Sequence, residues 1–594
     1  MDTTEDQKME IEVERLDDIP IIFGHLRKMK VQEAVDSAIE AHGNWQGLSH
    51  GWVVLIWLIH ILTEHNHCMD NVREWVRSHA HILSILSGQL VRELDFTDDR
   101  LALCLRQLSD TAVGRKIELF LGSHMLRVYD LGSSTPIVRL DATTEKVHHD
   151  PEKHPMFQVG KGKNGIYEVQ YKLMLASLDP LGLPLAIDAL SGDSADDPLY
   201  IPAYLRVKEI TQKAGMLMVG DSKMSALETR AVISVGDDFY LTPLKKDNEL
   251  LDNLLAPWVG REEEMIDVFR LHKGEERSSI ARGFEATRTQ QHEIGDETEE
   301  WKERLLIVYS EAYAKSMQKG LDARLDKAEE ALKALTPPPE RGKRQIRDEV
   351  QLKAFIKKIE KKYRVENLFV CDYKKEVTER QIRGYKNKPS RTKTQIRFQI
   401  SVNRNHEAIA KVENRAGWRI YASNAPEEKL PFTKAILAYR NQYIAENIFR
   451  RLKGDVLVIS PLYIHRDDHA KGLFLLLTLA ARVLALGDYL AKTALAKEDT
   501  EIAGLYPGNP KRSTATPTTE RILKAFAYIN LVIISVDKET RYQITPLTEV
   551  QERILELWDF SPTLYTQFAT GFAGDKKTKQ RTQGEMRLKL ENDR

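Results

Sequence analysis

The stretch YRNQYIAENIFRRLKGD, residues 439–455, contains one isolated acid, Glu446, among arginines and lysines. At 3.6 residues per turn, its apolar side chains fall on one side of a helix and its polar ones on an opposite arc of roughly 100°. The polar arc holds Tyr439, Gln442, Tyr443, Glu446, Arg450 and Lys453. We therefore expect a helix that buries its apolar side and presents a carboxylate in a basic and aromatic setting. The alternative is a solvated face on which Glu446 pairs with Arg450, one turn further along.

Length and composition restrict the class of protein. At 594 residues the chain is too long for one core, and roughly three to five domains are expected. The 87 Lys and Arg residues balance 88 Asp and Glu, for a net charge of -1. Because the net charge gives the whole chain no attraction to nucleic acid or membrane, any site for a polyanion must be local.

The sequence also bears on where the protein works. Its three cysteines lack paired spacing, which fits a reduced cytosolic protein. The acidic start, MDTTEDQKMEIEVERLDD, is neither a signal nor a transit peptide. The longest apolar runs, residues 52–62 and 473–486, are shorter than the ~20 residues that cross a bilayer. We expect buried helices, a cytoplasmic location and no membrane partner.

The hydrophobic pattern changes along the chain. Up to about residue 130 it has helical periodicity, and from about residue 135 the period becomes two. The elements then follow the order strand, hairpin strand, strand, helix, strand, which is that of a ribonuclease-H-like sheet. After residue 240 the pattern loosens into strand-like runs and one charged helix, Ala312 to Lys333, before helices resume. This loosened part indicates an insertion.

These patterns predict an α/β multidomain protein. Its ribonuclease-H-like core is interrupted by a mainly β insertion with helical segments, preceded by an all-helical N-terminal domain and followed by a helical C-terminal region. The expected boundaries are 1–130 for the helical N-terminal domain, 131–240 and 426–495 for the two parts of the core, 241–425 for the insertion, and 496–594 for the C-terminal region.

Two aspartates end neighbouring strands of the expected core. Asp141 terminates IVRLD and Asp221 terminates MLMVGD. Groups just beyond strand ends are where ligands gather in open α/β sheets, so the two carboxylates are candidates to share a divalent cation. With Glu446 as a third ligand they would hold two Mg²⁺ ions, a set that activates a water or a 3′-hydroxyl for phosphodiester displacement. The alternative is that each aspartate is an ordinary turn former.

The combination of these motifs resembles the DDE transposases of bacterial insertion sequences, and among them the large insertion-sequence-four superfamily. The signature Y-x2-R-x3-E-x6-K of that family is matched by Tyr439, Glu446 and Lys453, with Gln442 at the arginine position as in a long subgroup with a helical N-terminal domain. Further similar motifs are LDATT (140–144), DPLGLPLAIDALSGDSADD (179–197), GDSKMS (220–225), YASN (421–424) and DDHAKGLFLLLTLAARVLAL (467–486).

The resemblance implies a catalytic and metal-binding triad of Asp141, Asp221 and Glu446, two Mg²⁺ ions for which Mn²⁺ substitutes, and a homodimer on double-stranded DNA. It also implies that the helical domain 1–130 binds DNA and that the region 496–594 is suited to dimerisation or DNA contact. In the family, signature side chains bind phosphates near the transposon end. Tyr439 and Lys453 match that role, Gln442 supplies no charge, and Arg450 lies on the same face to compensate.

A second DNA contact is expected in the insertion. Residues 374–393 hold eight Lys or Arg against two Glu, a composition suited to a phosphate backbone. We select Lys386, Lys388, Arg391 and Lys393 as the DNA-binding cations, with a merely solvated loop as the alternative.

The function expected from the resemblance is cut-and-paste transposition. The enzyme would bind the terminal inverted repeats of its element, cleave the ends and join them to target DNA, in the bacterial cytoplasm at the nucleoid. The competing hypotheses are a catalytically silent DNA-binding descendant and a metal-dependent nuclease without strand transfer. No GxxxxGK[ST] or GxGxxG motif occurs, so nucleotide hydrolysis and a Rossmann cofactor are not supported.

Overall fold

The computed structural model describes residues 9–40, 43, 45–129, 131, 136–162, 165–270, 278–338, 345–383, 389–536 and 539–570. The chain divides into two compact units. Unit 1 comprises residues 1–241, 291–299 and 438–594, and unit 2 comprises residues 242–290 and 300–437. Unit 1 therefore contains the N-terminal helices, most of the expected core and the C-terminal region. The finer domain boundaries expected from the sequence stay predictions.

Helices fill most of the N-terminal part of unit 1. Twelve of the fifteen residues of α3 (His50–Glu64) are buried, which makes it the central helix of this part. Local caps begin two of the helices, because the side chains of Ser49 and Asp110 accept backbone N–H bonds from Trp52 and Ala112. The other helices are α1 (Ile19–Lys28), α2 (Val31–Ala38), α4 (Met69–Ser78), α5 (Ala80–Ser87), α6 (Asp98–Leu108) and α7 (Thr111–Val128).

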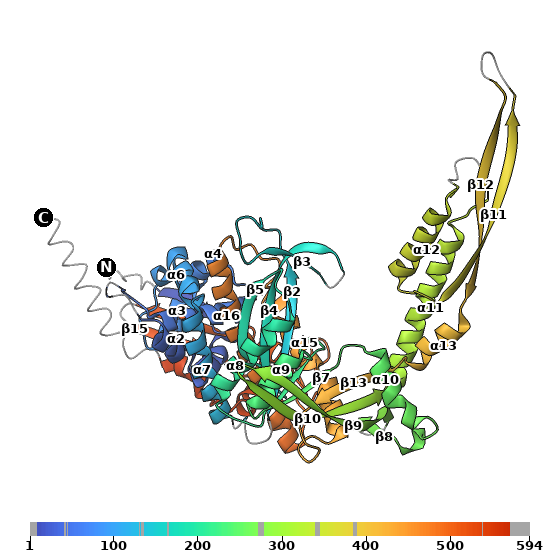
Figure 1. Ribbon diagram of the computed structural model, residues 1–594. Helices are drawn as coiled ribbons and strands as arrows, with labels where there is room; N and C mark the ends of the chain where they lie inside the picture. Colours follow the sequence, from blue (N-terminus) through green and yellow to red (C-terminus); the bar gives the residue numbers. More distant parts are fainter. Residues whose placement is uncertain are drawn as a thin grey trace, which may run out of the picture. The chain divides into compact units, whose positions relative to one another are not determined.

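A mixed sheet forms the centre of unit 1 (Figure 1). Its strands follow the order β3-β4-β2-β6-β7, and β5 also pairs with β4. The β2–β4 and β4–β5 pairs are antiparallel, whereas β6 runs parallel to both β2 and β7. The strands are β2 (Ile137–Lys146), β3 (Gln158–Lys161), β4 (Tyr167–Leu178), β5 (Leu183–Ser191), β6 (Leu217–Gly220) and β7 (Phe239–Pro243). Helix α8 (Tyr200–Thr211) connects β5 to β6, and α9 (Leu227–Val235) connects β6 to β7.

The region expected to be one signature helix is two helices. α14 (Phe432–Arg440) ends before Asn441, and α15 (Tyr443–Lys453) begins after Gln442. The apolar side expected of this stretch is buried, as Ile444, Ala445, Ile448, Phe449 and Leu452 show. The break places Tyr439 in α14, and only 7% of that residue is exposed. Its expected contact with phosphate stays a prediction.

Helix α16 (Asp467–Glu498) is the long helix that packs on β5. Tyr171 of β4 stacks on Phe474 of α16, and the buried Arg482 donates to the carbonyl of Leu185. Among the described helices, it alone is long and apolar enough to cross a membrane, but 83% of its apolar window is buried inside the protein. The run 473–486 is thus the middle of a longer core helix.

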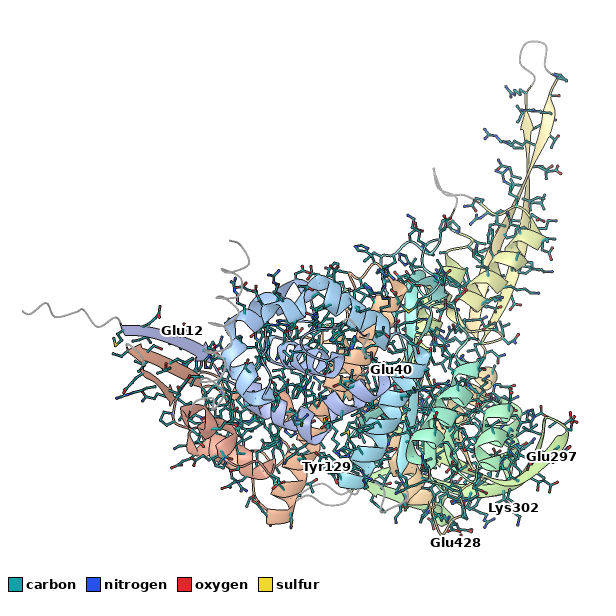
Figure 2. The ribbon with its side chains drawn as sticks, turned by 90° about the vertical axis from the view of Figure 1, so that its left-hand side faces the viewer. Glu12, Glu40, Tyr129, Glu297, Lys302 and Glu428 are labelled. Carbon is teal, nitrogen blue, oxygen red and sulfur yellow. The ribbon has the colours of Figure 1, made fainter. Side chains whose placement is uncertain are left out.

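A small sheet joins the two ends of the chain in unit 1. β1 (Met9–Arg15) pairs antiparallel with β14 (Asn530–Val536), which pairs with β15 (Glu539–Ile544); Glu12 marks β1 in Figure 2. The expectations of an all-helical N-terminal domain and a helical C-terminal region were therefore incomplete. The alternation of aliphatic and acidic residues in MEIEVER is the strand signal that helical periodicity nearby obscured. The C-terminal helices are α17 (Thr519–Lys524), α18 (Glu549–Leu557) and α19 (Thr563–Thr566).

Unit 2 contains an antiparallel sheet and a module with its own core. Strands follow the order β13-β10-β9-β8: β8 (Ile266–Arg270), β9 (Ser278–Ile294), β10 (Glu297–Tyr309) and β13 (Trp418–Ser423). Between β10 and β13 the chain forms α11 (Glu311–Lys333), α12 (Glu349–Tyr363), the hairpin β11 (Phe369–Ile382) and β12 (Arg391–Arg404), and α13 (His406–Asn414). Helix α10 (Asn248–Leu255) precedes the sheet. The strand-like runs and the charged helix expected here are confirmed.

Candidate active site at the ends of two parallel strands

Asp141 and Asp221 follow a pair of residues that are partners in the sheet. The parallel register of β2 and β6 runs from Ile137 opposite Leu217 to Leu140 opposite Gly220. The next residue on each strand is an aspartate. Because hydrogen-bonded strands lie about 4.8 Å apart, the two carboxylates arise from neighbouring backbone positions. Both side chains are half-buried.

A buried tyrosine holds Asp221. Tyr200, at the first turn of α8, is 1% exposed, and its hydroxyl donates to Asp221 Oδ1 at 2.7 Å. The same oxygen accepts the backbone N–H of Lys223 at 2.8 Å. Burial, with the negative charges of Asp221 and Asp141, raises the pKa of Tyr200 far above its usual range. The phenol therefore stays protonated and acts as a donor.

The C-terminal end of helix α15 is bound to β2. Lys453 donates to Thr143 Oγ1 at 2.8 Å and lies 2.6 Å from a carboxylate oxygen of Glu145. Near the other end of α15, Ile444 lies against Gly182, in the turn between β4 and β5. Glu446, between these two points, is exposed. Within the described part of the chain no ion pair joins Glu446 to Arg450, so the solvated pair considered as an alternative is not formed.

The buried Arg139 fixes the start of β2. Arg139, on the strand two residues before Asp141, donates to both carboxylate oxygens of Asp179 and to the carbonyl of Ala438. Burial raises the pKa of Asp179, and the Arg139 guanidinium opposes that rise. These contacts connect β2, the turn after β4 and the end of α14, two residues before Asp141.

The donor set fits hard divalent cations. Carboxylate oxygens are the ligands that Mg²⁺ prefers, and Asp141 and Asp221 supply them side by side. Across the described ranges, no three His, Cys, Asp or Glu side chains are grouped closely enough to hold a metal ion. The structure thus brings the two aspartates together, whereas the exposed Glu446 does not form a three-ligand group with them.

The remaining DNA-binding candidates differ in their surroundings. Arg450 is exposed and Gln442 is half-buried at the start of α15. Lys453 contacts Thr143 and Glu145 of β2, and its expected contact with a phosphate stays a prediction. Arg391 and Lys393 are exposed on β12, and Lys386 and Lys388 lie outside the described residues.

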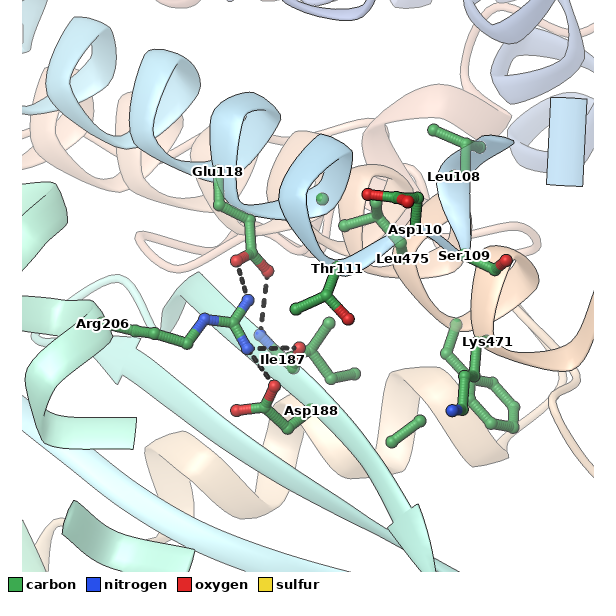
Figure 3. Close-up of a pocket in the computed structure, with 13 residues that line it drawn as sticks. Leu108, Ser109, Asp110, Thr111, Glu118, Ile187, Asp188, Arg206, Lys471 and Leu475 are labelled. Carbon is green, nitrogen blue, oxygen red and sulfur yellow. Dashed lines mark hydrogen bonds and ion pairs between the residues drawn. The ribbon is translucent and has the colours of Figure 1, made fainter. Parts of the chain in front are cut away.

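A cavity in unit 1 contains a charge network that the sequence did not reveal (Figure 3). The cavity has a volume of about 100 Å³. Arg206 of α8 binds Glu118 of α7 and Asp188 of β5, and it donates to the carbonyl of Ile187 at 3.0 Å. Burial raises the pKa of Glu118, whereas the cations Arg206 and Arg482 lower it. The paired charges of this network connect α7, α8 and β5.

Fold and site define a class: an α/β protein with two carboxylates at the ends of adjacent parallel strands. Residues 132–483 match the family described as the transposase DDE domain. The match covers more than half of the chain, and the protein belongs to this family. It is accordingly a DDE transposase, of a class that cleaves and joins DNA and generally uses divalent metal ions.

Other comparisons add little. No curated protein matches the sequence. Among solved structures, the cryo-EM structure of the piggyBac transposase synaptic complex with hairpin DNA is similar with a TM-score of 0.33 and 7% identity, over 93% of this chain and 84% of that chain. At that score the similarity supports no inference about this protein.

Proposed function

We propose that this protein is the transposase of a bacterial insertion sequence, in the long subgroup of the insertion-sequence-four-like superfamily. It binds the terminal inverted repeats of its element, cuts the ends and joins them to target DNA. The observation that carries the proposal is the register of β2 and β6, because Asp141 and Asp221 directly follow the paired residues Leu140 and Gly220. The strand order, antiparallel on one side of β2 and parallel on the other, supports a ribonuclease-H-like core.

The geometry of α15 supports Glu446 as the third carboxylate. Lys453 lies seven residues after Glu446, or about 10 Å along a helix, and it contacts β2 at residues 143–145. Asp141 precedes the middle of that segment by three residues, or about 10 Å along a strand. Since the start of α15 lies near the turn that adjoins the start of β2, helix and strand run in the same direction. Glu446 is then level with Asp141.

Asp141, Asp221 and Glu446 would hold two Mg²⁺ ions, with Mn²⁺ as a substitute. Such ions, when bound, supply Lewis acidity and a more acidic water or 3′-hydroxyl. The chain's own groups do the positioning. Tyr200 fixes one oxygen of Asp221. Arg450, exposed on α15, and Gln442, half-buried immediately before α15, bind phosphates next to the scissile one.

The partners and location follow from the same proposal. Double-stranded DNA is bound through the N-terminal helices and through cations of unit 2, among them Arg391 and Lys393, and two copies assemble on the paired ends. The enzyme acts in the bacterial cytoplasm at the nucleoid.

The test is a set of carboxylate replacements. Asp141→Asn, Asp221→Asn and Glu446→Gln should each abolish cleavage of a plasmid carrying the element's ends, since each removes a ligand charge but no phosphate contact. DNA binding measured in EDTA should be retained. Asp455→Asn is the matched control, because Asp455 is an exposed acid just beyond α15. A Glu446→Gln protein that cuts normally would refute the triad.

Product mapping separates the alternatives. Joined products between element ends and target DNA are expected from the parent protein. Cleaved ends without joining would identify a nuclease, and binding without cleavage under Mg²⁺ or Mn²⁺ would identify a silent descendant.

A further inference from the structure

A self-contained module is inserted between β10 and β13. Tyr309 and Trp418 are the last paired residues of these strands, and the N–H of Ser310 donates to the carbonyl of Gly417 at 3.0 Å. The intervening residues 311–416 therefore leave and rejoin the sheet at adjacent backbone positions. They have a core of their own, which consists of Leu321, Leu325, Ala328, Leu332, Leu352, Ile356, Val365, Leu368, Phe369, Phe398 and Ile409.

The β11–β12 ribbon of this module extends beyond its core. Paired residues run from Phe369–Arg404 to Ile382–Arg391, but the buried side chains end at Phe398. Val377, two residues further out along the ribbon, is 54% exposed. Figure 2 shows side chains projecting freely from the ribbon. A two-stranded ribbon is marginally stable alone, so core packing does not account for its outer part.

Like charges face each other on this outer part. Arg380 lies directly opposite Lys393, and Arg391 lies on the same face two residues along β12. All three are exposed, and within the described ranges no carboxylate forms an ion pair with them. Directly opposed like charges destabilise a strand pair. Their presence is explained when an anion lies between them and offsets the repulsion.

The surrounding segment is strongly basic. Residues 349–404 contain sixteen Lys and Arg against six Asp and Glu, a net charge of +10, within a chain whose total is -1. A charge imbalance so localised fits a polyanion. A two-stranded ribbon also fits the roughly 12 Å width of the major groove of duplex DNA.

We propose that the outer ribbon face formed by Arg380, Lys393 and Arg391 binds the sugar-phosphate backbone of duplex DNA without regard to sequence. Lysine and arginine contacts to phosphates carry no base information. The inference rests on the proposed function for its DNA partner, and it adds Arg380 and a specific face of the ribbon to the expected DNA contacts. Binding by this face requires no intact active site.

The experiment measures binding of the full chain to a labelled duplex of unrelated sequence, in EDTA, between about 50 and 200 mM salt. The double variant Arg380→Gln/Lys393→Gln should bind roughly tenfold or more weakly at about 0.1 M salt, and its log-log salt slope should be shallower by about 1.8. Its thermal midpoint should be unchanged or higher, because the opposed charges are gone.

The control is Lys319→Gln/Lys327→Gln. Both lysines are exposed on α11 of the same module, so the charge change is identical but the ribbon is intact. Equal effects of the two double variants would show that only net charge matters and would overturn the proposal, as would an unaltered slope for the ribbon variant. Tighter binding of duplex RNA would overturn the assignment to DNA.

The two proposals fail in different ways. If the parent chain binds duplex DNA through the ribbon but does not cut its ends, the proposed function fails and the ribbon assignment stands. If the parent cuts its ends and the ribbon variant binds duplex DNA normally, the ribbon assignment fails and the proposed function stands.

Discussion

Lys453 of α15 lies 2.6 Å from Glu145 of β2, and its ammonium group also donates to Thr143 Oγ1 at 2.8 Å. Lys453 therefore holds the helix that carries Glu446 against the strand that carries Asp141. Both partners of the ion pair are largely buried, with 28% and 22% of the side chains exposed, so solvent screens the pair less than a surface pair.

Lys453→Gln should lower the free energy of unfolding by about 1 kcal/mol, since an ion pair and two hydrogen bonds are weakened. Cleavage should fall because α15 is held less firmly, while DNA binding in EDTA should stay near normal. Arg450→Gln is the comparison: Arg450 is exposed one turn earlier, and its loss should weaken DNA binding and leave stability unchanged. Should Lys453→Gln weaken binding but not stability, Lys453 contacts phosphate as the sequence predicts.

Gln442→Arg introduces the arginine of the signature expected from the sequence. Gln442 immediately precedes α15 and is half-buried. An arginine here adds a bidentate phosphate donor, but a cation at a helix N-terminus costs about 0.3–1 kcal/mol. We expect tighter binding to element ends with a small loss of stability, measured by titration of end DNA and by urea unfolding. Unchanged affinity would show that residue 442 does not face DNA.

Local patterns predicted part of this site. The apolar side of α15 was predictable because five residues recur at helical spacing, and all are buried. The break before Tyr443 was not predictable, because no Gly or Pro between residues 439 and 443 marks it. The pairing of β1 with β14 joins residues more than five hundred positions apart, and the sequence contains no local signal for such a partner.

Tyr200 illustrates a contact at the candidate site that sequence patterns miss. It is a core residue by burial, yet its hydroxyl binds Asp221, twenty-one residues away. Only the geometry of α8 over the end of β6 shows this contact. The triad itself stays a prediction, founded on the register of two strands and the orientation of α15.

Tyr200→Phe should weaken divalent-metal binding and cleavage by roughly 10–100-fold, the usual effect of removing a hydrogen bond to a metal-ligating carboxylate. Titration calorimetry with Mn²⁺ gives the affinity without relying on activity. Tyr204→Phe is a matched control, because Tyr204 is a buried tyrosine on the same helix that donates to Asp238 at 2.9 Å. Similar Mn²⁺ affinity in the two variants would mean that Tyr200 has only a structural role.

Arg206→Met should remove the counter-charge of Glu118 and lower the free energy of unfolding by roughly 3–5 kcal/mol at pH 8, because a buried carboxylate is left unpaired. Burial already raises the pKa of Glu118 above its ordinary value of 4.5, and Arg206 opposes this rise; without Arg206 the folded-state pKa should rise further.

A carboxyl group whose folded-state pKa is raised favours the folded state fully below its unfolded pKa, and that contribution is lost as the pH rises through the folded pKa. The deficit of the Arg206→Met variant relative to the parent should therefore be smaller at pH 5 than at pH 8, as measured by urea unfolding at both values. Glu118→Gln combined with Arg206→Met should recover much of the loss and remove most of the pH dependence. A deficit that is equal at both pH values would show that Glu118 is not the group left uncompensated.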